Sequence, residues 1–87
     1  MRVIPSKNFE KKVVKLSMPI KSAVVERLRL FAEDQFHALL NNHALHGQQK
    51  HFRSINTTGD YRLIYEQYDA DTVRLIDIDT HSNLYGA

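Results

Sequence analysis

Residues 61–79 read YRLIYEQYDADTVRLIDID, and this stretch decides the fold class. Its first part, residues 61–68, is rich in aromatic and branched side chains, which are typical of β-strands. Its last part, residues 72–79, has the same character, and only the short segment 69–71 separates the two. Because so short a connection joins neighbouring antiparallel strands, the stretch predicts a β-hairpin.

The sequence before this hairpin predicts one more strand and a loop. Residues 51–57 have strand composition, and the turn Thr58-Gly59-Asp60 joins them to the hairpin. Residues 41–47 have turn residues at both ends and predict a loop. The three strands together predict an antiparallel meander.

Helical periodicity dominates the N-terminal part of the chain. Ser6 is a typical N-cap for a helix that runs to about Leu16, after a short strand at Val3–Ile4. A second helix, with Pro19 tolerated in its first turn, is expected to end near Asp34. The order predicts an α+β fold, with an N-terminal helical hairpin packed on one face of a four-stranded antiparallel sheet.

Length and composition narrow the class of protein. A chain of 87 residues is expected to form a single domain, residues 1–87. It has no cysteine, which excludes disulfides and thiolate metal sites. The N-terminal residues lack the apolar core of a signal peptide, and no apolar run is long enough to span a membrane. We therefore expect a cytoplasmic protein without a membrane partner.

The five histidines admit three interpretations. They are unrelated surface side chains, or an acid–base pair, or ligands of a zinc ion at His43 and His46. The chain has no cysteine and no H-E-x-x-H motif, so the sequence argues against zinc. From the residues alone, the first interpretation is preferred.

Basic and aromatic side chains on the strand half offer a second set of candidates. The basic residues are Lys50, Arg53, Arg62 and Arg74. Strict alternation places Arg74 on one face with Ile76 and Ile78, where an arginine is able to hold a phosphate or simply remain a solvated charge. Tyr61 beside a turn and Tyr85 near the C-terminus are the aromatics best suited to stack on unpaired RNA bases.

Three segments resemble sequence blocks of the YafQ-like toxins in the RelE/ParE superfamily. They are His43-Ala44-Leu45-His46-Gly47, Gly59-Asp60-Tyr61-Arg62-Leu63-Ile64-Tyr65 and Thr80-His81-Ser82-Asn83-Leu84-Tyr85-Gly86. They resemble the blocks H-x-L-x-G, (G/P)-D-(W/Y)-x-L-I-Y and T-H-x-x-L-(F/Y)-G, in the same order. Together they cover about half of the chain, residues 43–86. The helical hairpin and antiparallel sheet predicted above also fit this superfamily.

The resemblance implies specific site residues. Its catalytic set is His43, Asp60, His81 and Tyr85. Its RNA-binding or phosphate-binding set is Lys50, Arg53, Asn56, Tyr61 and Arg62. The family pattern has a histidine where this chain has Asn56, and an asparagine forms hydrogen bonds but does not shuttle protons at neutral pH.

The resemblance also implies a function. We expect a type II toxin that cleaves messenger RNA on the translating ribosome and is neutralised by a cognate antitoxin in a toxin–antitoxin hetero-oligomer. Attack by a ribose 2′-OH, with His43 and His81 as acid and base in either order, needs no metal or cofactor. Two alternatives stay open: a ParE-like toxin that binds DNA gyrase, and a degenerate toxin that retains only antitoxin binding. The block at residues 80–86 favours the nuclease.

Overall fold

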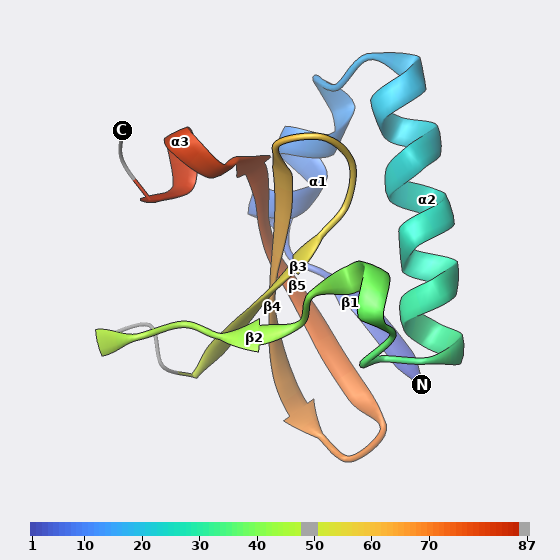
Figure 1. The fold of residues 1–87 in the computed structure, drawn as a ribbon, viewed down its shortest axis with the longest axis vertical. Coiled ribbons are helices and arrows are strands. Elements are labelled where there is room, and N and C mark those ends of the chain that lie inside the picture. The colour runs from blue at the N-terminus through green and yellow to red at the C-terminus, as the bar shows by residue number, and fades with distance from the viewer. Residues whose placement is uncertain (48–50, 86–87) are drawn as a thin grey trace.

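The computed structural model describes residues 1–47 and 51–85, which form an α+β fold (Figure 1). The elements in chain order are β1 (Arg2–Pro5), α1 (Lys7–Val14), α2 (Met18–Glu33), the 3₁₀ helix η1 (Ala38–Leu40), β2 (His43–Ala44), β3 (Phe52–Asn56), β4 (Tyr61–Asp69), β5 (Thr72–Thr80) and α3 (His81–Tyr85). The predicted fold class, helical hairpin and three-stranded meander are confirmed. Within the described ranges, no helix has the length and apolar character needed to cross a membrane.

The sheet differs from the prediction in strand number and in direction. It has five strands in the order β1-β5-β4-β3-β2, not four. The extra strand is β2, whose two residues pair with β3 inside the segment predicted as a loop. β1 pairs with β5 in parallel, so the sheet is not wholly antiparallel. A segment of two residues carries too little periodicity to be predicted, and strand direction at an edge depends on how the helical hairpin returns the chain.

Local sequence features explain where the helices begin and end. The Ser6 side chain accepts a hydrogen bond from the Phe9 amide at 3.1 Å, so it caps α1 as expected. α1 ends at Val14, two residues before the predicted end at Leu16. Pro19 lies in the first turn of α2, where its missing amide hydrogen costs no helical bond.

The core lies between α2 and one face of the sheet. Phe31 of α2 is fully buried and meets the buried Tyr65 of β4 edge-on, with ring centroids 4.8 Å apart. Ile55 of β3 and Leu63 of β4 are also fully buried in this cluster. In Figure 1, α2 lies on one side of the sheet and α3 on the other. The second face therefore remains available for a site formed by α3 and the strand ends.

A β-bulge changes the faces of β5. The register of β4 and β5 shifts between Ile64 and Tyr65, so strict alternation fails along β5. Arg74 is exposed and lies 3.5 Å from Glu66, while Ile78 is buried in the core. The prediction that Arg74 shares a face with Ile78 is therefore wrong, and Arg74 is a surface charge balanced by a neighbouring strand.

Candidate active site

An open pocket of about 380 Å³ joins two of the three sequence blocks. Its lining residues are His43, Ala44, Leu45, His46, His81 and Tyr85. The first four belong to β2 and the residues after it, and the last two to α3. Folding thus brings together three of the four predicted catalytic residues from distant parts of the sequence.

His43 is oriented by the backbone beside it. Its Nδ1 lies 2.8 Å from the carbonyl oxygen of Asn41. Because a carbonyl oxygen only accepts hydrogen bonds, Nδ1 carries the hydrogen and Nε2 is the nitrogen left for other chemistry. The Asn41 backbone is left-handed, with φ of 45°, where the chain leaves η1 and turns into β2. The exposed His43 ring is therefore fixed by its own turn.

Asn42 anchors the segment that carries His43. Its amide nitrogen donates to the Tyr65 hydroxyl at 2.7 Å and to the Gln35 carbonyl oxygen at 3.1 Å. Its amide oxygen accepts from Arg53 Nε at 2.8 Å. Three bonds on one half-buried side chain thus tie the residue before β2 to Gln35, just after α2, and to strands β3 and β4.

The structure places Arg53 away from the pocket. His43 pairs opposite Ser54, so alternation along β3 turns Arg53 to the other face, with Ile55. There the Arg53 guanidinium lies 5.5 Å from the centre of the Phe36 ring, a cation–π distance. Lys50, another member of the predicted RNA-binding or phosphate-binding set, lies outside the described residues.

The C-terminal block forms a one-turn helix, α3, directly after β5. The Thr80 hydroxyl accepts a hydrogen bond from the backbone amide of Asn83 at 3.3 Å and so caps α3. The His81 amide donates to the carbonyl oxygen of Asp60 at 2.8 Å. The helical spacing of four brings the His81 and Tyr85 rings to a centroid distance of 4.7 Å.

The remaining predicted residues surround the β3–β4 turn. Asp60 is exposed, and its main chain holds the start of α3. Arg62 Nη1 donates to the carbonyl oxygens of Gly59 at 3.0 Å and Tyr61 at 2.9 Å, so this arginine braces the turn. Tyr61 is half-buried and lines a different hollow, beside Lys12.

Two polar atoms on the pocket side of β3 stand out. Asn56 is the register partner of Arg62, and Ser54 is the register partner of His43. Ser54 Oγ and Asn56 Oδ1 are buried and have no hydrogen-bond partner within residues 1–47 and 51–85. A buried polar group without a partner costs roughly 1–3 kcal/mol, and such groups commonly mark functional sites.

Comparison with known proteins identifies the family. Residues 1–86 match the family model described as "Bacterial toxin of type II toxin-antitoxin system, YafQ". The chain belongs to this family. The relationship expected from the three sequence blocks is therefore confirmed for this YafQ-family toxin. No curated protein sequence matches it significantly.

Solved structures show the same fold. The YoeB/ParE toxin from Agrobacterium tumefaciens has a TM-score of 0.77 at 14% identity, covering 93% of this chain and 99% of that one. The RelBE2 toxin–antitoxin complex from Mycobacterium tuberculosis has a chain with a TM-score of 0.75 at 23% identity, covering 92% and 96%. The DinJ-YafQ complex from E. coli has one with a TM-score of 0.73 at 23% identity, covering 97% and 96%. At these identities the likeness establishes the fold alone.

His46 is a pocket residue of this YafQ-family toxin that the predicted catalytic set left out. It lines the pocket with His43 and is exposed. Its position three residues after His43, within the same sequence block, is the signal that could have identified it, although that spacing is also typical of zinc ligands. In the part of the chain that the structure describes, no three histidine, aspartate or glutamate side chains group as metal ligands do.

Proposed function

We propose that this YafQ-family toxin is an endoribonuclease that cleaves messenger RNA on the ribosome. The observation that carries the proposal is the meeting of His43, His81 and Tyr85 in one open pocket. Two imidazoles in one pocket supply an acid and a base, and an adjacent aromatic ring offers a surface on which a base can stack. Neither gyrase binding nor antitoxin binding alone requires such a pair.

His43 is proposed as the base and His81 as the acid. The hydrogen bond from Nδ1 to Asn41 leaves Nε2 of neutral His43 as an acceptor for the proton of a ribose 2′-OH. The 2′-oxygen then attacks the adjacent phosphorus, and the bond from phosphorus to the 5′-oxygen breaks. His81 gives its proton to that 5′-oxygen, which leaves a cyclic phosphate and a 5′-hydroxyl.

Arg62 and Asn56 are proposed to contact the reacting phosphate. They are register partners, and alternation places them on the sheet face of Ser54 and Ile64. One terminal nitrogen of Arg62 donates its hydrogen bonds to the β3–β4 turn. The other donors of the guanidinium can stabilise the negative charge that develops on the phosphoryl oxygens. The Asn56 amide offers hydrogen bonds without proton transfer, so it replaces the family histidine only as a binding group.

The other predicted residues take supporting roles. Asp60 holds the His81 backbone, and its exposed carboxylate is proposed to orient an imidazole or to assist as a base. Tyr61 and Lys50 stay predicted RNA contacts. For Arg53, we favour the anchoring of Asn42 over phosphate binding, because it lies on the face opposite His43. This chemistry uses side chains alone, so the proposed reaction needs no metal or cofactor.

The decisive experiment is single-turnover cleavage of ribosome-bound message, with RNA ends mapped. His81→Ala and His43→Ala should each slow cleavage by about a hundredfold to ten-thousandfold, with little change in the melting temperature. Once the cut site is known, a message with sulfur in place of the 5′-oxygen needs no acid. That substrate should rescue His81→Ala and leave His43→Ala slow.

Other outcomes identify the competing functions. If wild-type protein leaves the message intact but inhibits DNA gyrase, the ParE-like alternative holds. If it does neither and still binds an antitoxin, it is a degenerate toxin. A zinc-selective chelator at constant magnesium should leave cleavage unchanged, and loss of activity that zinc restores would overturn the metal-independent mechanism.

We further propose a cognate antitoxin as the physiological partner, with both proteins in the cytoplasm. The family match supports this, as do the toxin–antitoxin complexes among the similar structures. Such a partner typically contributes an amphipathic helix or an added strand. Co-expression with the neighbouring small open reading frame should restore growth and yield a co-purified hetero-oligomer. Free expression without growth arrest and without a captured partner would refute this.

A further inference from the structure

α3 carries two pocket residues but has little structure of its own. It has five residues, which is far below the length at which an isolated helix is stable. None of its residues is buried, and only Leu84 is half-buried. Apolar packing alone therefore gives His81 and Tyr85 a weakly defined position, and polar contacts must supply the rest.

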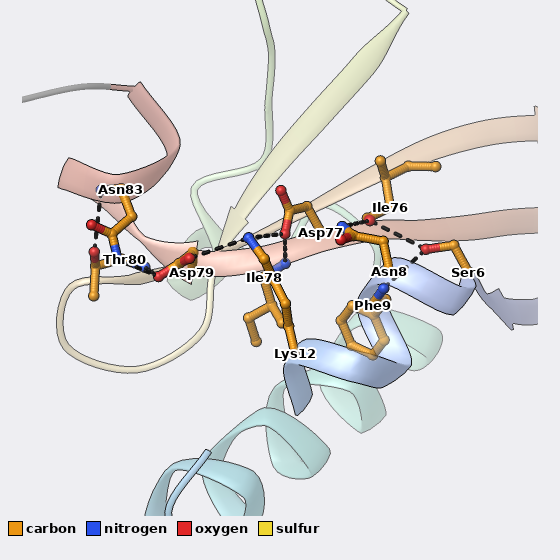
Figure 2. A network of polar contacts seen from close by, with 10 residues as sticks. All are labelled: Ser6, Asn8, Phe9, Lys12, Ile76, Asp77, Ile78, Asp79, Thr80 and Asn83. Atoms are coloured by element: carbon orange, nitrogen blue, oxygen red, sulfur yellow. Dashed lines mark hydrogen bonds and ion pairs between the residues drawn. The ribbon is translucent and has the colours of Figure 1, made fainter. Parts of the chain in front are cut away.

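The Asp60 carbonyl and the Thr80 hydroxyl hold the first turn of α3, and a further contact comes from Asp79, the last residue but one of β5. One of its carboxylate oxygens, Oδ1, accepts hydrogen bonds from the Asn83 amide group and from the Thr80 backbone, each at 2.8 Å. Figure 2 shows Asn83 pointing back from α3 to this oxygen. Asp79 thus ties the middle of α3 to the strand that precedes it.

The second oxygen of Asp79 is held from α1. Lys12 Nζ lies 3.2 Å from Asp79 Oδ2 and 2.8 Å from Asp77 Oδ1, so one ammonium group bridges two carboxylates of β5 (Figure 2). A hydrogen bond to Asp77 is the main cause that raises the pKa of Lys12. A hydrogen bond from Asn83 is the main cause that lowers the pKa of Asp79. Both charged forms are therefore favoured near neutrality.

α1 itself is fixed to the same strand. The Ser6 hydroxyl donates to the carbonyl oxygen of Ile76 at 3.2 Å, and the Asn8 amide donates to that same oxygen at 2.9 Å (Figure 2). These bonds place Lys12 beside the C-terminal half of β5. A continuous set of contacts thus runs from the N-terminal helix, across β5, to α3.

We propose that Lys12, Asp79 and Asn83 are positioning residues that set the angle of α3 and so aim His81 and Tyr85 into the pocket. The catalytic part of this inference rests on the proposed RNA cleavage, whereas the structural part does not. Displacement of a catalytic group by about 1 Å can cost about a hundredfold in rate. Loss of the network should therefore lower the rate of the chemical step more than the affinity for RNA.

The first test removes the bond between α3 and β5. Asn83→Ala should lower the single-turnover cleavage rate about tenfold to a hundredfold and change RNA affinity less than twofold. Ser82→Ala, on an exposed position of the same helix, is the matched control and should change neither. Asp79→Asn combined with Asn83→Asp restores a hydrogen bond in the opposite sense, and should recover part of the rate lost in Asn83→Ala.

The second test acts at a distance, from α1. Lys12→Met keeps the aliphatic stem and removes the ammonium group, whereas Lys12→Arg keeps a cation. Lys12→Met should slow cleavage about tenfold, whereas Lys12→Arg should cleave at close to the wild-type rate. Lys11→Met, at an exposed position of α1, is the control and should not change the rate. If Lys12→Met weakens RNA binding and leaves the rate unchanged, Lys12 is an RNA contact and the positioning proposal is wrong.

A readout without RNA separates this inference from the proposed function. In NMR spectra, Asn83→Ala and Lys12→Met should shift the ring signals of His81 and speed amide exchange in α3, while Ser82→Ala should not. These spectra decide the structural part even if the wild-type protein cleaves no RNA. Unchanged His81 signals and unchanged α3 exchange in both variants would overturn the proposal.

Discussion

Asn42→Ala should be among the most destabilising polar-to-alanine changes in this protein. The substitution removes three hydrogen bonds: one with the Arg53 guanidinium, one with the Tyr65 hydroxyl and one with the Gln35 backbone. Neutral bonds contribute about 0.5–1.5 kcal/mol each, and bonds to a charged group about 1.5–3 kcal/mol. Asn42 and Arg53 are only half-buried, so the lower ends of these ranges apply, which gives about 2.5 kcal/mol.

Thermal and urea denaturation measure this loss directly. For a domain of this size, about 2.5 kcal/mol corresponds to a fall of roughly 10–20 °C in melting temperature. Arg53→Met removes the guanidinium and keeps most of the stem, which makes it the partner variant for a double-mutant cycle. The coupling energy between the two positions should be about 1 kcal/mol. Tyr65→Phe should cost about 1 kcal/mol, because the phenyl ring keeps the packing against Phe31.

Two results would refute the reasoning about Asn42. A melting temperature for Asn42→Ala within about 3 °C of wild type would mean that these bonds contribute no net stability. A coupling energy near zero would mean that Arg53 does not act through Asn42. Arg53→Met also separates the two roles of this arginine. If the Arg53 side chain contacts an RNA phosphate, Arg53→Met should reduce the slope of log affinity against log salt concentration by about one, and the free energy of unfolding should stay unchanged.

Two further predictions concern folding stability. The folded-state pKa of Asp79 lies below the ordinary aspartate value of 3.8, chiefly because the Asn83 side chain donates a hydrogen bond to it. The contribution of the Asp79 carboxylate to the free energy of unfolding is therefore complete above the unfolded-state pKa and disappears as the pH falls through the folded-state pKa. Between about pH 5 and about pH 2, the free energy of unfolding should therefore fall less for Asp79→Asn than for wild type in denaturation measurements. Gly59→Ala should lower the free energy of unfolding by about 1–2 kcal/mol in a urea titration, because φ at this position is +53° and an alanine side chain strains that backbone. Apart from the neighbouring residues 58 and 60, no atom of residues 1–47 and 51–85 lies within 4 Å of the added Cβ, so a steric clash adds nothing.

The strands and helices followed from local patterns, whereas the register did not. The composition of residues 61–68 and the Ser6 cap are local signals, and both predicted the observed elements. The bulge in β5 is invisible to alternation, because a single inserted residue leaves the composition unchanged and reverses the faces that follow it. For this reason the shared face of Arg74 and Ile78 was predicted wrongly, although Arg74 is a solvated charge, as one of its two interpretations had it.

The site was predictable as a set of residues and not as a geometry. Two of the three sequence blocks supplied His43, His81 and Tyr85, which the structure places in one pocket. Alternation along β3 places Arg53 on the face of Ile55, but the sequence does not show which face the helices cover, and that face decides whether an arginine reaches the pocket. The sequence analysis predicted no helix at residues 81–85, because one turn is too short to show periodicity and its bonds to Asp60 and Asp79 appear only in the folded chain.

The pocket residues obtain their orientation from neighbours that do not line the pocket. His43 and His81 are both exposed, so neither is fixed by burial of its own side chain. Asn42, immediately before His43, is bonded to groups on the helix-facing side of the sheet, and Asp79, shortly before His81, is bonded to α1. Each of the two histidines is thus anchored through a polar residue one or two positions earlier in the chain. An exposed site held in this way is accessible to a large polymer such as the proposed RNA substrate, and we expect its geometry to respond to substitutions at residues that do not contact that substrate.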